Sequence, residues 1–235
     1  MRTLTRALLV PLVALAALCG PLPAHAQSVD LGADLMSRYV WRGADFGESM
    51  SIQPSLSLSA GGFTIGSWGA YAINPQSAGA NEHDLWVSYA VETSGGTIEA
   101  GVTDYYFPNA GVGFFNFEND GAGGHQIEPY LSYTGPDPFP ISLYGGVFVY
   151  NEPGRSVYLE ASYPFQVESV DLAVAVGGTP AESAFYGTRQ AGLINMSLTA
   201  AERIPITDAF SLPVQISYVL NPYAEKTFFV FGVSL

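Results

Sequence analysis

Apolar and polar residues alternate along most of the chain after residue 27. Between residues 52 and 60, for example, isoleucine, proline and leucine at even positions alternate with glutamine and serine at odd positions. Successive side chains of a strand point to opposite faces, so this pattern predicts strands with one apolar and one polar face. We expect twelve strands, at residues 29–42, 50–60, 62–73, 83–93, 96–106, 125–134, 141–151, 155–164, 168–178, 190–200, 211–221 and 226–235.

The last expected strand, residues 226–235, is strongly apolar. Phe229, Phe231, Val233 and Leu235 fall on one of its faces. A bare edge of this kind promotes aggregation in a soluble sheet, whereas in a closed barrel the last strand pairs with the first. The expected strands are also about as long as tilted strands that cross a membrane. We therefore predict an all-β fold for residues 27–235, a transmembrane antiparallel up-and-down β-barrel of about twelve strands.

The connections between the expected strands alternate between short and long. An even number of strands places both chain ends on the periplasmic side. Turns on that side would be residues 60–62, 94–96, 135–140 and 165–167, with a longer one at 201–210. The external loops would include residues 107–124 and 179–189.

Residues 1–26 have the features of a cleaved signal peptide. Arg2 and Arg6 precede an apolar run at residues 7–18, and an A-x-A cleavage site follows at residues 24–26. Cys19 is the only cysteine, so the mature chain has no thiol for a disulfide or a metal site. Export predicts the outer membrane of a Gram-negative bacterium. The partners would be outer-membrane lipid, lipopolysaccharide and the barrel assembly machinery.

The composition is acidic but sparse in charge. The net charge is −13, while charged residues are only 12% of the chain and aromatic residues are 13%. A negative chain is a poor partner for nucleic acid. A soluble β-sandwich would normally carry more surface lysine and glutamate. Few charges and many aromatic residues instead fit a barrel with an apolar outer band.

The run Ser37-Arg38-Tyr39-Val40-Trp41-Arg42-Gly43 resembles the opening motif of the TorF-type porin family of bacterial outer-membrane proteins. Shorter similar stretches follow at residues 53–56, 104–108, 117–128 and 220–222. The resemblance covers most of the mature chain and implies a barrel and a channel, with no catalytic residues to carry over. One departure is the C-terminal Leu235, where many outer-membrane barrels end in Phe or Trp.

If the leucine-rich face of each strand contacts lipid, the other face lines the lumen. On this basis the candidate pore-lining residues are Asp34, Arg38, Arg42, Gln53, Glu99, Glu128, Glu160, Asp171 and Gln215. The same face carries Asp84 and Glu92. Two interpretations are open. The charges could pair with one another and close a narrow barrel, or they could form a constriction in which carboxylates outnumber arginines and favour cations or neutral solutes.

Aromatic residues gather near the expected outer rim: Tyr39, Trp41, Tyr105, Tyr106 and Phe107. An aromatic girdle at the lipid headgroups is one interpretation, and stacking platforms for a sugar-like solute are the other. The mature chain has two histidines, His83 and His125, at strand–loop junctions. They lack the pattern of a metal site, so we expect neither a metal nor a cofactor.

These features predict a porin-like outer-membrane channel, not an enzyme, that passes small hydrophilic solutes by passive diffusion. It could act as a monomer or as a homo-oligomer. One alternative is a closed structural or interaction barrel that presents its loops. Another is an outer-membrane lipid hydrolase, which needs a Ser–His pair and an orienting Asn or Asp. His125 with Asn119 or Asp120 is the only start for such a site in the sequence.

Overall fold

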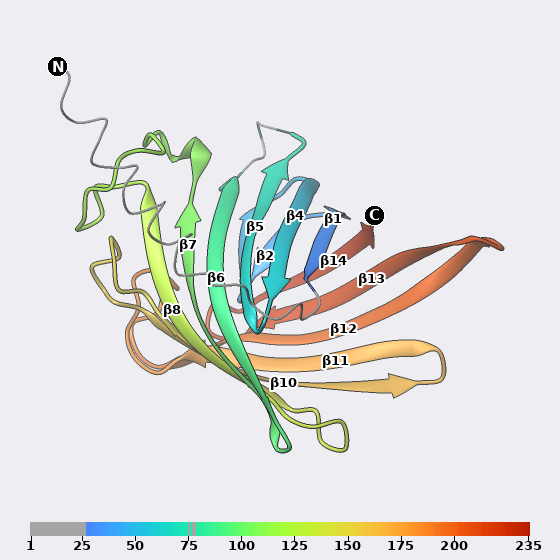
Figure 1. Ribbon diagram of the computed structural model, residues 1–235. Coiled ribbons are helices and arrows are strands. Elements are labelled where there is room, and N and C mark those ends of the chain that lie inside the picture. The colour runs from blue at the N-terminus through green and yellow to red at the C-terminus, as the bar shows by residue number, and fades with distance from the viewer. Residues whose placement is uncertain (1–26, 75, 77–78) are drawn as a thin grey trace, which may run out of the picture.

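The computed structural model describes residues 27–74, 76 and 79–235, so the expected signal peptide lies outside the described residues. Twelve antiparallel strands form one closed barrel, as predicted (Figure 1). Neighbours in the chain pair with each other, and the first strand pairs with the last. The strands are β1 (Ser28–Met36), β4 (Ser51–Ala60), β5 (Phe63–Ala72), β6 (Glu82–Thr93), β7 (Gly96–Tyr106), β8 (His125–Thr134), β9 (Ser142–Val147), β10 (Val157–Val167), β11 (Val170–Thr179), β12 (Gly192–Thr207), β13 (Phe210–Asn221) and β14 (Lys226–Ser234).

The leucine-rich face of each strand points out of the barrel. On β4, Leu56 and Leu58 are 45% and 49% exposed, whereas Ser51 and Gln53 are buried. The same orientation is found on other strands, whose exposed residues include Leu159, Val174 and Phe231. Because the side chains alternate, the polar residues between them face the interior. An apolar outer surface of this extent is typical of a barrel that crosses a lipid bilayer.

The first wall strand ends earlier than expected, at Met36 rather than at residue 42. Ser37 still exchanges two hydrogen bonds with the backbone of Phe231, and the chain then leaves the wall. It forms a separate two-stranded hairpin from β2 (Tyr39–Trp41) and β3 (Ala44–Gly47). Tyr39 and Trp41 continue the spacing of apolar residues at every second position of β1, so the sequence pattern alone did not mark the break.

The β2–β3 hairpin turns at Arg42 and Gly43, which have φ angles of 49° and 73°. Two successive left-handed residues are typical of a tight hairpin turn. A Cβ atom on Gly43 would lie 1.8 Å from the carbonyl oxygen of Ile194, so only glycine fits against β12. Val40 packs on a buried apolar cluster inside the barrel formed by Met36, Val219, Phe228 and Val230.

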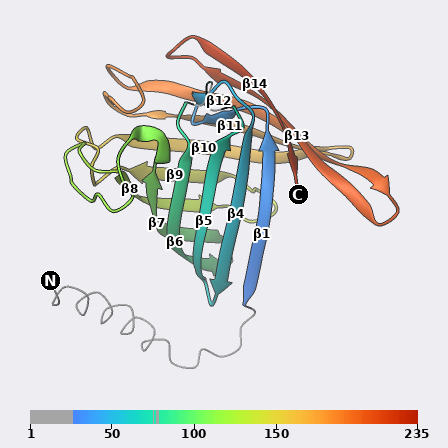
Figure 2. The ribbon, with the colours of Figure 1, turned by 90° about the horizontal axis from the view of Figure 1, so that it is seen from above.

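Several other strand bounds differ from the expected ones, including the turn expected at residues 165–167, which lies within β10; the ends of β12 and β9 differ most. Residues 201–210 form not a long turn but the end of a hairpin, in which only residues 208 and 209 separate β12 from β13. Both views show this hairpin projecting past its neighbours (Figures 1 and 2). In contrast, β9 stops at Val147. Beyond it, Phe148 donates a backbone hydrogen bond to Ser156 on one side and Val149 donates one to Ile127 on the other, which breaks the regular ladder.

The seam that closes the barrel is short. β1 pairs with β14 through three residue pairs, Asp34–Ser234, Leu35–Val233 and Met36–Gly232. Ala33 and Leu235 extend it by exchanging two backbone hydrogen bonds of 3.2 and 2.9 Å. On its other side β1 pairs with β4 along its whole length, from Ser28 to Met36. The N-terminal half of β1 therefore has a strand neighbour on one side only.

The outward orientation of β4 can be tested with arginine. Leu56 lies near the middle of β4 and points outward, so Leu56→Arg should lower the free energy of unfolding in lipid vesicles by about 2–4 kcal/mol. Ser57→Arg is the matched control, since Ser57 faces the interior and can hydrate there. Urea titrations followed by tryptophan fluorescence would measure both. Equal costs for the two variants would contradict the orientation.

Candidate functional site

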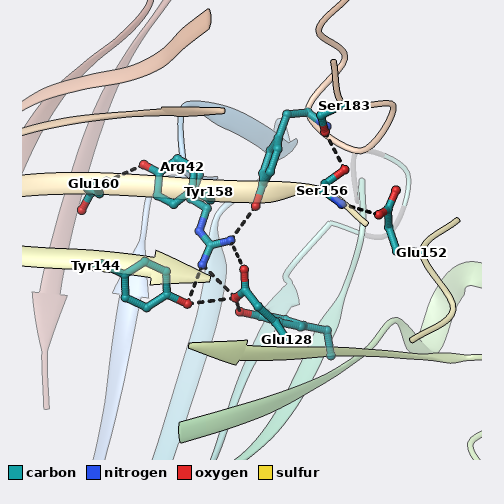
Figure 3. Close-up of polar contacts among 10 residues, drawn as sticks. Arg42, Glu128, Tyr144, Glu152, Ser156, Tyr158, Glu160 and Ser183 are labelled. Atoms are coloured by element: carbon teal, nitrogen blue, oxygen red, sulfur yellow. Dashed lines mark hydrogen bonds and ion pairs between the residues drawn. The ribbon is translucent and has the colours of Figure 1, made fainter. Parts of the chain in front are cut away.

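The β2–β3 hairpin carries Arg42 across the interior of the barrel. The guanidinium group donates to both carboxylate oxygens of Glu128 on β8, at 2.8 and 2.9 Å (Figure 3). It also donates to the phenol oxygens of Tyr144 on β9, at 2.9 Å, and Tyr186, at 2.6 Å. One side chain therefore joins the hairpin to two wall strands and to the loop between β11 and β12.

Glu128 is completely buried, and its charge is well satisfied. Besides the two bonds from Arg42, its Oε2 atom accepts hydrogen bonds from Tyr105 at 2.8 Å and from Tyr144 at 2.9 Å. A buried carboxylate is tolerated only when an opposite charge and further donors replace the lost water. Arg42 and Glu128 thus form a neutral, fully bonded pair in the interior.

Aromatic rings surround the guanidinium group of Arg42. Its Cζ atom lies 4.1 Å from the ring centre of Trp41, 4.4 Å from that of Tyr158 and 5.1 Å from that of Tyr144. A guanidinium group at such distances is attracted by the negative ring faces. Burial also raises the pKa of the Tyr186 phenol above its ordinary value, so this residue remains a neutral hydrogen-bonding group.

The loop after β11 folds over the same cluster. Phe185 packs on Phe148 and Trp41, with ring centres 4.6 and 6.2 Å apart. Ser183 donates a 2.7 Å hydrogen bond to Ser156, whose backbone nitrogen donates to Glu152 at 2.7 Å (Figure 3). The loop is thereby fastened to the segment before β10. The hairpin and this loop together occupy the interior at the level of Arg42.

A cavity of about 540 Å³ adjoins the Arg42 cluster. Trp68, Trp86 and Tyr130 contribute aromatic walls, and Asp84 and Glu99 contribute carboxylates. These residues lie on β5 to β8, on the inward faces of the strands. Their positions follow from the alternation of inward and outward side chains along each strand. This alternation could have identified Trp68, Trp86 and Tyr144 as interior residues. Charge alone, which marked the other candidates, does not mark these aromatic residues.

Two buried carboxylates on β6 stand next to this cavity. Glu82 is 1% exposed and Asp84 is 8% exposed. Within residues 27–74, 76 and 79–235, the Oε2 atom of Glu82 and the Oδ1 atom of Asp84 have no hydrogen-bond donor. Buried polar atoms are rarely left in this state, and the two neighbouring carboxyl groups also interact with each other.

The candidate pore residues are distributed along the barrel. Arg38 and Arg42 do not stand on the wall strand where they were expected, because β1 ends at Met36. Arg38 is paired with Asp45 of the hairpin at 3.1 Å. Glu99 accepts a 2.6 Å hydrogen bond from Tyr130, and Glu160 accepts one of 2.9 Å from Asn195. The remaining candidates lie elsewhere on β1, β4, β11 and β13: Asp34, Gln53, Asp171 and Gln215. A role for any of them in a pore stays a prediction.

The aromatic residues expected at the rim do not form one girdle. Tyr39 and Tyr105 are buried, and Trp41 packs against Tyr105 inside the barrel at 5.6 Å. The hairpin brings Tyr39 and Trp41 inward, and Tyr105 lies on the inward face of β7. Tyr106 lies on the opposite face of β7 and stacks on His125, with ring centres 5.2 Å apart. Phe107 stacks on Phe46 of the hairpin, with ring centres 6.5 Å apart.

The two histidines have separate partners. His125 is buried, with Nδ1 2.9 Å from Asp104 and Nε2 in contact with the carbonyl oxygen of Phe114, not with Asn119 or Asp120. His83 lies 2.9 Å from Ser67, a contact that the sequence does not mark because 16 positions separate the two residues. Among the residues described, no acid or amide hydrogen-bonds His83, and no three His, Cys, Asp or Glu residues are grouped as metal ligands.

Of the comparisons with known proteins, the one with solved structures agrees with this architecture. Residues 22–135 match a family described as a bacterial protein of unknown function (Gcw_chp). No curated protein matches the chain. Among the solved structures that match is a KdgM porin, which is 12% identical, has a TM-score of 0.56, and is aligned over 88% of this chain and 98% of its own. The barrel is porin-like. At this identity the likeness concerns the fold alone, and the TorF-type assignment stays a prediction.

The Arg42–Glu128 pair should hold the hairpin in the interior. Glu128→Gln removes the negative charge and leaves a buried guanidinium group without a counter-ion, which typically costs about 3–5 kcal/mol. Because the hairpin is not part of the wall, we expect local release, seen as faster amide hydrogen exchange at residues 39–47. Glu160→Gln is the control, as Glu160 does not contact Arg42. Unchanged exchange in Glu128→Gln would contradict this role.

Proposed function

We propose that the protein is an outer-membrane channel through which small hydrophilic solutes diffuse passively, with a preference for cations over anions. The observation that carries the proposal is the division of the barrel into an apolar outer face and an interior with an excess of carboxylates. Polar side chains inside a closed barrel are what a water-filled path requires. Selection in such a path depends on its width and on the sign of its charge, without any covalent step.

The excess of negative charge supports the preference for cations. Arg42 is already neutralised by Glu128 and Arg38 by Asp45. Neither arginine is therefore left to balance the carboxylates on the inward faces of β7 and β10, which are Glu99 and Glu160. Charges of one sign along a narrow path with low-dielectric walls raise the local concentration of the opposite ion.

One observation favours a second candidate, a closed barrel that acts through its loops. The hairpin and the loop with Phe185 and Tyr186 fill the interior at the level of Arg42. In the channel that we propose, this level is the constriction, and the width left beside the Arg42–Glu128 pair sets the largest solute that passes. In the closed barrel it is a permanent plug, and no ionic current flows.

Ion selectivity tests the proposal directly. In planar bilayers with a KCl gradient, the reversal potential should indicate a preference for K⁺ over Cl⁻ that fades at high salt as screening shortens the reach of the charges. Glu99→Gln should weaken the preference, and Arg38→Gln should strengthen it by freeing Asp45. Asp137→Asn, in the exposed β8–β9 turn, is the control. Anion preference would contradict the proposed selectivity, and a silent bilayer would favour the closed barrel.

A further inference from the structure

We infer that a window in the barrel wall beside the β1–β14 seam binds a phospholipid with a zwitterionic headgroup, one that carries an ammonium group and a phosphate. The inference goes beyond the proposed channel and does not depend on it. A cavity of about 670 Å³ lies at this place, lined by residues of β1, β4, β12, β13 and β14. Four features indicate its ligand: open strand edges, walls from both faces of the barrel, unpaired charges of both signs, and an apolar outer mouth.

The window lies where β1 and β13 both extend beyond β14. β1 is bonded to β14 only from Ala33 onward, through the exchange with Leu235, and β13 pairs with β14 only from Val214 onward. Among the described residues, no strand joins residues 28–32 of β1 to residues 210–213 of β13. Figure 2 shows the C-terminus between β1 and the projecting β12–β13 hairpin. Open backbone groups at a membrane need polar partners, which a lipid headgroup can supply and an acyl chain cannot.

Residues from both faces of the wall line this cavity. Asp34 stands opposite Gln53, an interior residue of β4, so its side chain faces the interior. Asp30, four positions earlier on β1, has the same orientation because side chains alternate along a strand. Leu31 has the opposite orientation and points outward. The cavity therefore passes through the wall rather than lying on one side of it.

The polar side of the window carries charges of both signs. Arg203 of β12 lines it together with Asp30 and Asp34. Among the described residues, none of these three side chains takes part in a hydrogen bond or an ion pair. A guanidinium group matches the oxygens of a phosphate, and carboxylates accept hydrogen bonds from an ammonium group. A ligand with negative charge alone would be repelled by the two carboxylates, whereas a zwitterionic headgroup satisfies both signs.

The outer mouth of the window is apolar. Leu31, Phe210 and Leu235 line it, and all three are exposed. An acyl chain that leaves the headgroup in the window would lie against them, as lipid does along the apolar outer face of a barrel. An added polypeptide strand fits less well, because the open edge of β13 includes Pro213, which lacks the N–H group that strand pairing uses.

Retention of a single-chain lipid measures the site without any current. The folded protein in a neutral detergent would be titrated with lysophosphatidylethanolamine, and native mass spectrometry would count the molecules retained. We expect one tightly held molecule, and about tenfold weaker retention of lysophosphatidylglycerol, which lacks the ammonium group. Arg203→Gln and Asp34→Asn should each weaken retention of the first lipid about tenfold. Arg189→Gln, in the exposed β11–β12 loop, is the control and should change nothing.

Gly32 allows the window to be blocked without a change of charge. A Cβ atom on Gly32 would lie 3.5 Å from the hydroxyl oxygen of Ser55 and 3.6 Å from the carbonyl oxygen of Leu235, which are ordinary contacts. The wall therefore tolerates a side chain there. Gly32→Phe should fill the window and abolish retention, and slower gel migration after boiling would verify that this variant and the others are folded.

Several results would overturn the inference. Equal retention of the two lipids, or retention that Arg203→Gln and Gly32→Phe leave unchanged, would mean that the apolar outer wall alone holds lipid. Absence of retention would also overturn it, and slow amide hydrogen exchange at residues 28–32 would then indicate a polypeptide strand on the open edge of β1. None of these results depends on an ionic current, so the failure of this site and the failure of the proposed channel are distinguishable.

Discussion

Closure of the backbone hydrogen-bond ladder is the constraint on which the rest of this structure depends. Each wall strand has two neighbours in the ring, and the ring closes only because β1 meets β14, although the N-terminal half of β1 is paired on one side alone. Once the ring is closed, each side chain of a wall strand faces either outward or into the interior. Apolar side chains such as Leu56 face outward, and polar ones such as Gln53 face inward. Charge in the interior must then find partners there.

The Arg42–Glu128 pair meets that need in an unexpected way, because the arginine does not belong to the wall. The chain leaves β1 after Met36, turns at Arg42 and Gly43, and delivers the guanidinium group to strands on the other side of the interior. Neutralising this arginine has a second effect. Carboxylates that could have shared its charge, such as Glu99 and Glu160, are left without an arginine partner, and the proposed cation selectivity rests on them.

Much of the fold could be predicted, because alternation is a local property. The pattern on β4 or β14 reveals a strand and its outward face without knowledge of its neighbours, so the number and orientation of the wall strands were recovered. The inner hairpin was not, since Tyr39 and Trp41 alternate as they would in a wall strand. Partners also escaped prediction: Arg42 and Glu128 are 86 positions apart, and only the closed ring brings them together. The alternation of side chains along β5 and β6 could by itself have placed Trp68 and Trp86 in the interior.

The short seam between β1 and β14 has a mechanical consequence. A ring of strands is weakest at the joint with the fewest hydrogen bonds, and here that joint holds three residue pairs and the bonds of Ala33 with Leu235 and of Ser37 with Phe231, against the full length of β1 on its other side. The ladder around the rest of the ring can therefore stay intact while this joint opens. Parting at this point would turn the cylinder into a curled sheet whose interior faces the bilayer from the side. The barrel thus has a built-in line of weakness parallel to its strands, next to the place where the inner hairpin begins.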